Sequence, residues 1–182
     1  MPHYILTLGA STSHNSINKK LANYASNLIN DYQIIGIDLN NFEMPIYSVD
    51  RENANGVHAK AVEFKKLISE SAGIVISLAE HNGSYTAAFK NIIDWTSRLE
   101  GKLWDDKPML LLSASPGGRG GATVLAAASG TFPFMGADIV GTLSIPKFQE
   151  NFSPSVGLNN DALKAELLDL SLIHISEPTR PY

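Results

Sequence analysis

Short apolar stretches alternate with longer segments of helical periodicity along the chain, and this alternation constrains the fold more than any other feature. Five apolar stretches rich in β-forming residues occupy positions 4–8, 33–39, 73–79, 108–114 and 139–145. Most of them are continuously apolar, as expected for strands that are covered on both faces. Strands and helices in alternation predict a parallel sheet with helices on both sides.

The segments between these stretches carry apolar residues at helical spacing. Such spacing occurs within 17–28, 57–68 and 88–99, and it begins again at Leu163 after the last strand. Right-handed crossovers leave few topologies for five strands and five helices. We therefore expect an α/β, flavodoxin-like three-layer fold whose five-stranded parallel sheet has the order 2-1-3-4-5.

Composition narrows the class of protein further. The length of 182 residues and the hydrophobic content of 44% favour one domain with a substantial core. No cysteine is present, which excludes thiolate catalysis and cysteine-ligated metal centres. A net charge of −4 with interspersed acids and bases argues against a nucleic-acid partner. Apolar runs such as 109–112 are too short to span a bilayer, and no secretory signal is visible. We expect a cytoplasmic protein without a membrane partner.

The final segment differs in character from the rest. The sequence from Leu170 to Arg180 resembles the translation of a transposase adapter used in preparing sequencing libraries. Segments of this kind are left out of reasoning about folds. We therefore expect a domain over residues 1–170 and a non-native tail over residues 171–182.

Three loops stand where this fold binds ligands, which is outside the carboxyl ends of the strands at the reversal of strand order. The first loop, residues 9–16, carries four hydroxyl side chains and opens directly into a helix. Hydroxyls and free N–H groups at a helix N-terminus favour an anion, and several such donors together suit a phosphomonoester. Simple capping of the helix by Asn15 or Ser16 is the alternative.

Three other known motifs, for phosphate binding, dinucleotide binding and nucleophilic catalysis, do not match the sequence around this loop. A P-loop needs two glycines and a Lys-Ser or Lys-Thr pair, whereas only Gly9 is present. The dinucleotide fingerprint needs three glycines, so Asp38 stands without the motif that would make it a ribose ligand. Residues 16–19 match a Ser-x-x-Lys pattern, but no Lys-Thr-Gly follows.

The second and third loops, residues 80–85 and 115–121, are rich in groups that suit an aromatic ligand. Asn82 offers a donor and an acceptor, and His81 can lie flat against a heterocycle. Four glycines between 117 and 121 allow backbone amides to approach a ligand closely. The alternatives are an ordinary Asn-Gly turn and a helix start made mobile by glycine. Adjacent Glu80 and His81 lack the spacing of metal ligands.

Taken in order, several short motifs resemble the NAD(P)H-dependent FMN reductase family. They are residues 10–11, 16–21, 44–47, 80–84, 90–95 and 113–118, and the resemblance covers about residues 3–170. It implies that the first loop holds the FMN phosphate through Ser11, Ser13, Ser16 and Asn18. It implies that Pro45, Ile46 and Tyr47 flank the flavin from the loop after the second strand. The ring and ribityl chain would be lined by Glu80, His81, Asn82, Gly83, Ser84, Ser115, Pro116, Gly117 and Gly118.

The sequence departs from the family pattern at two of these positions. The family usually has arginine where Ser13 stands, so the phosphate loses a cation here. It usually has tyrosine where His81 stands, which weakens the expectation of ring stacking. Lys90 and Trp95 also match the family, but we expect structural roles for both.

The resemblance implies an enzyme in which bound FMN carries the chemistry and no side chain is catalytic. NADPH or NADH would pass a hydride from its C4 to flavin N5, and a quinone, azo, nitroaromatic or flavin acceptor would then take the electrons by ping-pong chemistry. The alternatives are a flavodoxin-like electron carrier, for which a more acidic chain is expected, and a flavin-free binding module. Family members are commonly dimers or tetramers, so a homodimer or homotetramer is expected.

Overall fold

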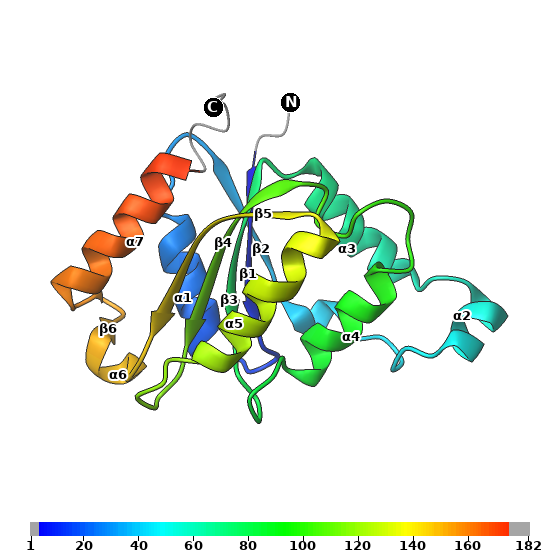
Figure 1. Cartoon of the computed structure of the whole chain (residues 1–182), viewed down its shortest axis with the longest axis horizontal. Helices are drawn as coiled ribbons and strands as arrows, with labels where there is room; N and C mark the ends of the chain where they lie inside the picture. Colours follow the sequence, from blue (N-terminus) through cyan, green and yellow to red (C-terminus); the bar gives the residue numbers. More distant parts are fainter. Residues whose placement is uncertain (1–3, 175–182) are drawn as a thin grey trace.

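A five-stranded parallel sheet with the order β2-β1-β3-β4-β5 forms the centre of the protein, which confirms the expected topology (Figure 1). The structure is a computed structural model that describes residues 4–174. The strands are β1 (Tyr4–Ala10), β2 (Gln33–Ile37), β3 (Gly73–Leu78), β4 (Lys107–Ala114) and β5 (Ala137–Ile145). Each overlaps one of the five apolar stretches.

Helices connect successive strands and complete the layers. The α-helices are α1 (Ile17–Ser26), α2 (Val49–Asn55), α3 (Ala59–Glu70), α4 (Ala87–Thr96), α5 (Ala122–Thr131), α6 (Phe148–Asn151) and α7 (Asp161–His174). Two short 3-10 helices are η1 (Leu39–Phe42) and η2 (Phe132–Met135). Outside the main sheet, β6 (Phe152–Ser153) and β7 (Gly157–Leu158) form a small antiparallel pair.

Different helices cover the two faces of the sheet. Ile5 of β1 belongs to one buried core, together with Leu21 of α1 and Leu167 of α7. The next residue, Leu6, faces the other way and shares a second core with Phe64 of α3 and residues of α4 and α5. Figure 1 shows the same division, with α1 and α7 on one side and α3, α4 and α5 on the other. Burial on both faces explains why the strands are continuously apolar.

The arm formed by α2 has no counterpart in the hydrophobic periodicity of the sequence. None of its residues is buried, and the helix projects from the body of the protein (Figure 1). Local signals define its ends instead. At the start, Ser48 Oγ accepts a hydrogen bond from the Arg51 amide at 3.3 Å, and at the end Gly56 has a φ of 74°. A short capped helix without an apolar stripe is invisible to a periodicity argument.

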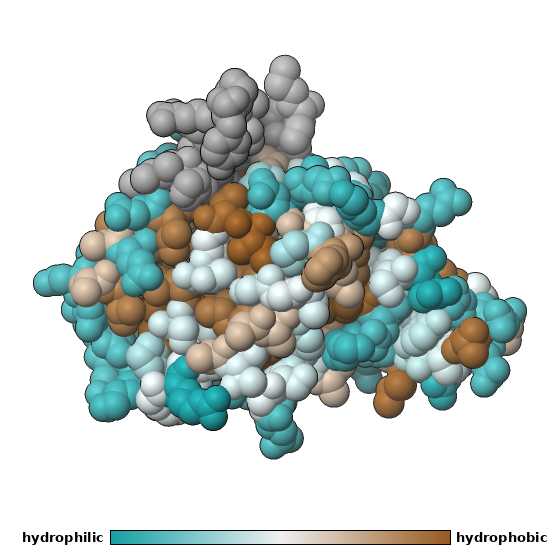
Figure 2. Space-filling view, viewed as in Figure 1, coloured by the Kyte–Doolittle hydropathy of each residue, from teal (hydrophilic) through white to brown (hydrophobic). Residues whose placement is uncertain are grey.

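The last helix, α7, packs closely against the edge strand β5. A Cβ atom at Gly141 would lie 2.5 Å from the Leu170 side chain, so a larger residue would require that side chain to shift. Figure 2 shows apolar residues gathered over α7 and β5. The helix continues to His174, past the domain boundary expected at Leu170. Residues 175–182 of the expected tail lie outside the described residues.

No helix in the part of the chain that the structure describes could cross a bilayer.

Candidate functional site

The loops that follow β1, β3 and β4 meet around one hollow of about 270 Å³. This arrangement follows from the topology, since these three strands are neighbours and end at the same edge of the sheet. Half of the cofactor-binding residues expected from the sequence line the hollow, namely Ser11, Ser13, Ser16, Asn18, Glu80, His81, Ser115 and Pro116. Asn15, Ile17, Ala79 and Ala114 complete the lining.

The N-terminus of α1 opens into this hollow. Ser16 caps the helix, since its Oγ accepts a hydrogen bond from the Lys19 amide at 3.2 Å. The expected capping is therefore present, but it leaves the hydroxyl hydrogen of Ser16 able to donate elsewhere. The amides of Ile17 and Asn18 are the first two of the helix and have no acceptor within it. Together these donors and the helix dipole favour an anion.

A close contact between β1 and α1 fixes the position of this helix N-terminus. A Cβ atom at Gly9 would lie 2.4 Å from the Lys19 Cα, so any other residue would push the helix away from the strand. The loop between them is folded back on itself, because the Ser13 amide donates to Ser11 Oγ at 3.1 Å. Glycine at position 9 thus has a packing role rather than a role in phosphate binding.

The side chain of Asn18 is held against the sheet by three hydrogen bonds. Its Nδ2 donates to the Ala114 carbonyl at 3.1 Å, and its Oδ1 accepts from the Ala114 amide at 2.9 Å and from the Ser77 hydroxyl at 2.7 Å. Only 3% of Asn18 is exposed. The backbone amide of Asn18 is available to an anion, and the contact of its side chain with the FMN phosphate stays a prediction.

Glu80 likewise has a structural partner. Its carboxylate accepts a hydrogen bond from the Val124 amide at 3.0 Å. Val124 lies in the first turn of α5, whose N-cap residue Gly121 has no side chain to serve this purpose. A carboxylate at a helix N-terminus is stabilised by the helix dipole. Glu80 thus joins the second loop to the helix that follows the third loop.

The rest of the second loop is a tight two-residue hairpin. His81 and Ser84 exchange backbone hydrogen bonds of 2.9 and 3.1 Å. Between them, Asn82 and Gly83 have φ angles of 52° and 74°. Two successive positive φ angles at Asn-Gly are typical of a hairpin turn, which confirms the turn anticipated from this dipeptide. Asn82, Gly83 and Ser84 form the tip of this hairpin and do not line the hollow.

The third loop is anchored at both ends and open in the middle. The Ser115 amide donates to the Ile145 carbonyl at 3.3 Å, and the Gly117 carbonyl accepts from the Lys147 amide at 2.9 Å. Gly120 is enclosed, with φ at 62° and its missing Cβ directed at the Ser144 hydroxyl. Gly118, in contrast, is exposed and has no atom within 4 Å of a Cβ position. The backbone at Gly118 is thus accessible to a ligand.

Among the residues that the structure describes, no lysine or arginine lines the hollow. Lys19, at the start of α1, is bound to Asp38 at 2.6 Å. Hydrogen bonds from Lys19 and from the Asn40 amide lower the pKa of Asp38 to about 2. Asp38 thus has a structural role, in agreement with the missing dinucleotide motif. Arg119 donates to Thr123 at 2.7 Å. An anion in the hollow would be held by neutral donors.

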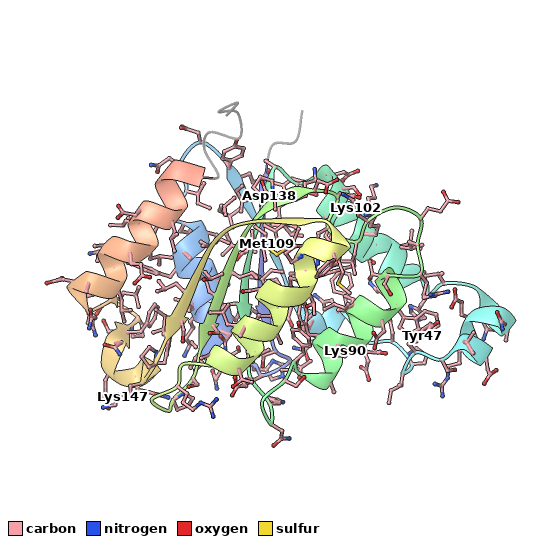
Figure 3. All side chains as sticks on the ribbon, viewed as in Figure 1. Tyr47, Lys90, Lys102, Met109, Asp138 and Lys147 are labelled. Atoms are coloured by element: carbon pink, nitrogen blue, oxygen red, sulfur yellow. The ribbon has the colours of Figure 1, made fainter. Side chains whose placement is uncertain are left out.

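The loop carrying Pro45, Ile46 and Tyr47 does not line the hollow. It is attached to α4 instead, where Asn91 accepts from the Tyr47 amide at 2.9 Å and the Trp95 indole donates to the Pro45 carbonyl at 2.7 Å. Figure 3 shows Tyr47 between α4 and the α2 arm. Trp95 is 2% exposed, which confirms its structural role. Contact of this loop with a flavin stays a prediction.

A family model described as NADPH-dependent FMN reductase matches residues 4–150 of the chain. A 2-hydroxy-1,4-benzoquinone reductase from Burkholderia is 32% identical over 120 residues, which cover 65% of this chain and 63% of that relative. A quinone reductase from Escherichia coli K12 is 35% identical over 80 residues, covering 44% of this chain and 43% of the relative. The chain thus spans less than two thirds of the length of these relatives.

Solved structures share the fold over almost the whole chain. A flavoenzyme NAD(P)H:(acceptor) oxidoreductase from Paracoccus denitrificans aligns with a TM-score of 0.73 and 21% identity, covering 93% of both chains. An FMN-dependent NADH-azoreductase from Bacillus anthracis, solved in complex with FMN, aligns with a TM-score of 0.61 and 16% identity over 93% of this chain and 96% of that one. At these identities the likeness shows a common architecture.

In the described residues, no cluster of three or more acidic or histidine side chains is placed to hold a metal ion.

Proposed function

The chain belongs to the NADPH-dependent FMN reductase family, and on that basis we propose that it uses bound FMN to carry electrons from NADH or NADPH to a small acceptor. A quinone is the acceptor class named for the Burkholderia and Escherichia coli relatives. The observation that carries the proposal is the convergence of three loops on one hollow, whose lining includes the N-terminus of α1.

The donors at the base of the hollow fit the FMN phosphate. The amides of Ile17 and Asn18 would donate to phosphate oxygens, and the hydroxyls of Ser11, Ser13 and Ser16 would add further hydrogen bonds. No lysine or arginine of the described part of the chain lines the hollow, so hydrogen bonds and the helix dipole would stabilise the charge. This pattern agrees with the serine that stands where the family usually has arginine.

The open parts of the second and third loops fit the remainder of the cofactor. Gly118, with its accessible backbone, and the hairpin tip at Asn82 and Gly83 belong to the two loops whose neighbouring residues line the hollow, and we propose that the aromatic ring lies against their main chain. When bound, FMN would accept a hydride at N5 and release two electrons to the acceptor. The residues of these loops would orient the ring and donate hydrogen bonds to it, with none acting as acid or base.

A quinone, azo, nitroaromatic or flavin acceptor and ping-pong kinetics are the finer parts of the proposal. A homodimer or homotetramer and a cytoplasmic location also remain predictions. An electron carrier of the flavodoxin type is the second candidate, but a net charge of −4 gives only weak steering toward a basic protein partner.

The first test asks whether the α1 N-terminus binds FMN. Proline at the first position of a helix keeps the helix but removes one amide donor, so Ile17→Pro removes a single hydrogen bond to the phosphate. A charge-assisted hydrogen bond contributes about 1.5–3 kcal/mol, so the dissociation constant of FMN should rise about tenfold or more. Val49→Pro, at the first position of α2, is the matched control and should leave FMN affinity unchanged.

The second test separates the two functions. The wild-type protein is loaded with FMN and mixed anaerobically with NADH and with NADPH. Bleaching of the flavin absorbance by either nucleotide supports the enzyme. A yellow protein that neither nucleotide bleaches would indicate an electron carrier. A wild-type protein that takes up no FMN would contradict the proposal altogether.

A further inference from the structure

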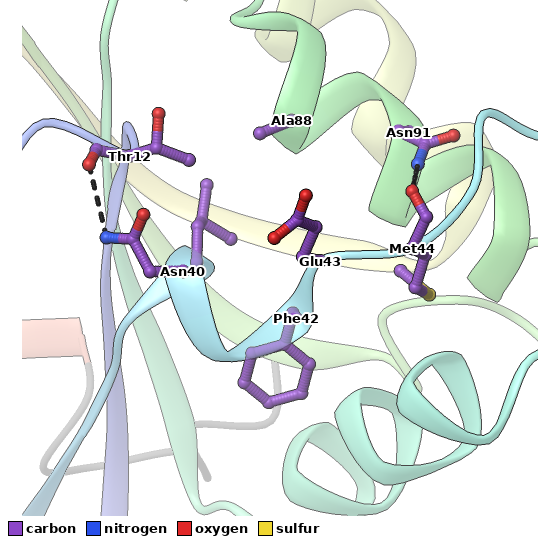
Figure 4. Close-up of a pocket in the computed structure, with 8 residues that line it drawn as sticks. Thr12, Asn40, Phe42, Glu43, Met44, Ala88 and Asn91 are labelled. Carbon is purple, nitrogen blue, oxygen red and sulfur yellow. Dashed lines mark hydrogen bonds between the residues drawn. The ribbon is translucent and has the colours of Figure 1, made fainter.

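A second hollow, of about 310 Å³, lies between the loop that joins β1 to α1, the segment after β2 and helix α4 (Figure 4). Thr12 lines this second hollow, whereas its neighbours Ser11 and Ser13 line the first. The loop therefore separates the two hollows as a wall between them. The rest of the second hollow is built from η1, from the residues that follow it and from the first turns of α4.

Glu43 places a free carboxylate in this second hollow. Figure 4 shows the carboxylate directed into the space between Thr12, Ala88 and Asn91. Glu43 has no hydrogen-bond or ion-pair partner among the residues that the structure describes. Its two oxygens are therefore available as acceptors, and the residues lining the hollow include no lysine, arginine or histidine to neutralise them.

The amide donors that line the hollow are already used within the protein. Asn40 Nδ2 donates to the Thr12 carbonyl at 3.1 Å and to Asp38 at 2.8 Å. Asn91 Nδ2 donates to the carbonyls of Met44 and Pro45, each at 3.2 Å. The second hollow thus offers a ligand several acceptors and, among the described side chains that line it, the Thr12 hydroxyl as the one unengaged donor, with apolar surface from Leu39, Met44 and Ala88 beside them.

This chemistry selects among the small molecules that the proposed function involves. A quinone presents carbonyl oxygens, which are acceptors and find few donors here. An adenosine group presents a planar heterocycle for the apolar surface, and its ribose presents two hydroxyl donors for a carboxylate. Recognition of a ribose 2′-hydroxyl by an acidic side chain is the way in which many proteins bind NAD, whereas a 2′-phosphate requires a cation.

We infer that the second hollow binds the adenosine end of NADH, with Glu43 accepting hydrogen bonds from the ribose hydroxyls. The inference rests on the proposed function. It makes Glu43 a residue that determines specificity, because the 2′-phosphate of NADPH would bring negative charge against an unneutralised carboxylate. The protein therefore prefers NADH to NADPH, although the family description names NADPH.

The kinetic test compares the two nucleotides on the FMN-loaded protein. Like charges placed together at a binding site are strongly unfavourable, so kcat/KM for NADH should exceed that for NADPH by about tenfold or more. Glu43→Gln keeps the shape of the side chain and removes its charge, and should lower this ratio at least about fivefold. Glu100→Gln, another exposed carboxylate without a partner among the described residues, is the control and should leave the ratio unchanged.

Two results would overturn the inference while leaving the proposed function intact. One is faster reduction of the flavin by NADPH than by NADH in the wild-type protein. The other is a ratio that Glu43→Gln changes by less than twofold while the flavin is still reduced.

A binding measurement tests the second hollow even if neither nucleotide reduces the flavin. Adenosine has no phosphate and cannot use the anion site at α1. Ligand-observed NMR should detect adenosine binding to the wild-type protein and to Glu100→Gln, and a loss of at least about fivefold in affinity for Glu43→Ala. Equal binding by all three proteins, or no binding by the wild-type protein, would refute the adenosine site.

Discussion

Asn18 supplies Ala114 with the pair of hydrogen bonds that a neighbouring strand would otherwise supply. The last residue pair between β3 and β4 joins Leu78 to Ser113. Ala114 therefore extends one residue beyond the end of β3 and has no partner on that strand. The side-chain amide of Asn18 takes that place, with one donor and one acceptor facing the Ala114 backbone. Helix α1 is thereby fastened to the sheet at the edge where the candidate cofactor site lies.

Replacing Asn18 by alanine should destabilise the fold strongly. The change leaves the Ala114 amide and carbonyl and the Ser77 hydroxyl without partners in a buried setting. Each buried unpaired group costs about 1–3 kcal/mol, so we expect the free energy of unfolding in urea to fall by about 3 kcal/mol or more. Asn27→Ala removes an exposed side-chain bond to the Asn23 carbonyl and should cost little. A loss below about 1 kcal/mol for Asn18→Ala would contradict this role.

The ion pair between Lys19 and Asp38 should make stability depend on pH in the acid range. The pKa of Asp38 is lowered from 3.8 to about 2 in the folded protein, mainly by the Lys19 hydrogen bond. The stabilisation that ionised Asp38 gives to the folded protein is therefore fully present above pH 3.8 and is lost as the pH falls through 2. Since the pair is about one third exposed, the contribution should be below about 1 kcal/mol.

Urea unfolding at pH 5 and at pH 2 measures this contribution. Between these two values, the wild-type protein should lose more stability than Asp38→Asn, which has no carboxylate to protonate at position 38. Glu100→Gln should behave like the wild type. An Asp38→Asn variant that loses as much stability as the wild type would show that the pair contributes nothing.

Adding a methyl group at Gly118 should affect cofactor binding and not the fold. A Cβ at this position meets no atom within 4 Å, so Gly118→Ala should leave the melting temperature unchanged or slightly raised. If the flavin ring lies against this backbone, the affinity for FMN should fall about tenfold. Gly130→Ala, at a helix position with equal free space, is the control and should not change FMN affinity. Unchanged binding by Gly118→Ala would remove this loop from the cofactor site.

Glu80 should stabilise the start of α5. Removing a side-chain helix cap costs about 0.5–2 kcal/mol, so Glu80→Ala should lower stability by that amount. Glu80→Gln keeps an acceptor oxygen and should cost less. Hydrogen exchange provides the local measurement, because the Val124 amide should exchange faster in Glu80→Ala than in the wild type. Equal exchange rates would show that the hydrogen bond gives no protection.

The positions of the loops were predictable from the sequence, whereas the directions of their side chains were not. Apolar strands and helical spacing define the strand order, and the strand order places three loops at one edge. Asn18 shows the limit of this reasoning. Its spacing from Leu21, Ala22 and Ala25 puts it on the buried face of α1, but that spacing does not identify Ala114 and Ser77 as its hydrogen-bond partners. The contact of Asn18 with the FMN phosphate that the resemblance implies stays a prediction.

The other features that the sequence did not predict depend mainly on contacts between residues far apart in the chain. The partner of Glu80 lies 44 positions away on α5, and no local pattern identifies it. The α2 arm buries no residue and leaves no apolar period. The second hollow depends on η1 and α4 meeting near Thr12, which requires the three-dimensional arrangement of the layers.

The wall between the two hollows has a thermodynamic consequence. Asn40 holds the Thr12 carbonyl, so the conformation of this short loop is shared by both compartments. Two molecules that both shift this loop, one from each side, would change each other's affinity, and by linkage the two changes are by the same factor.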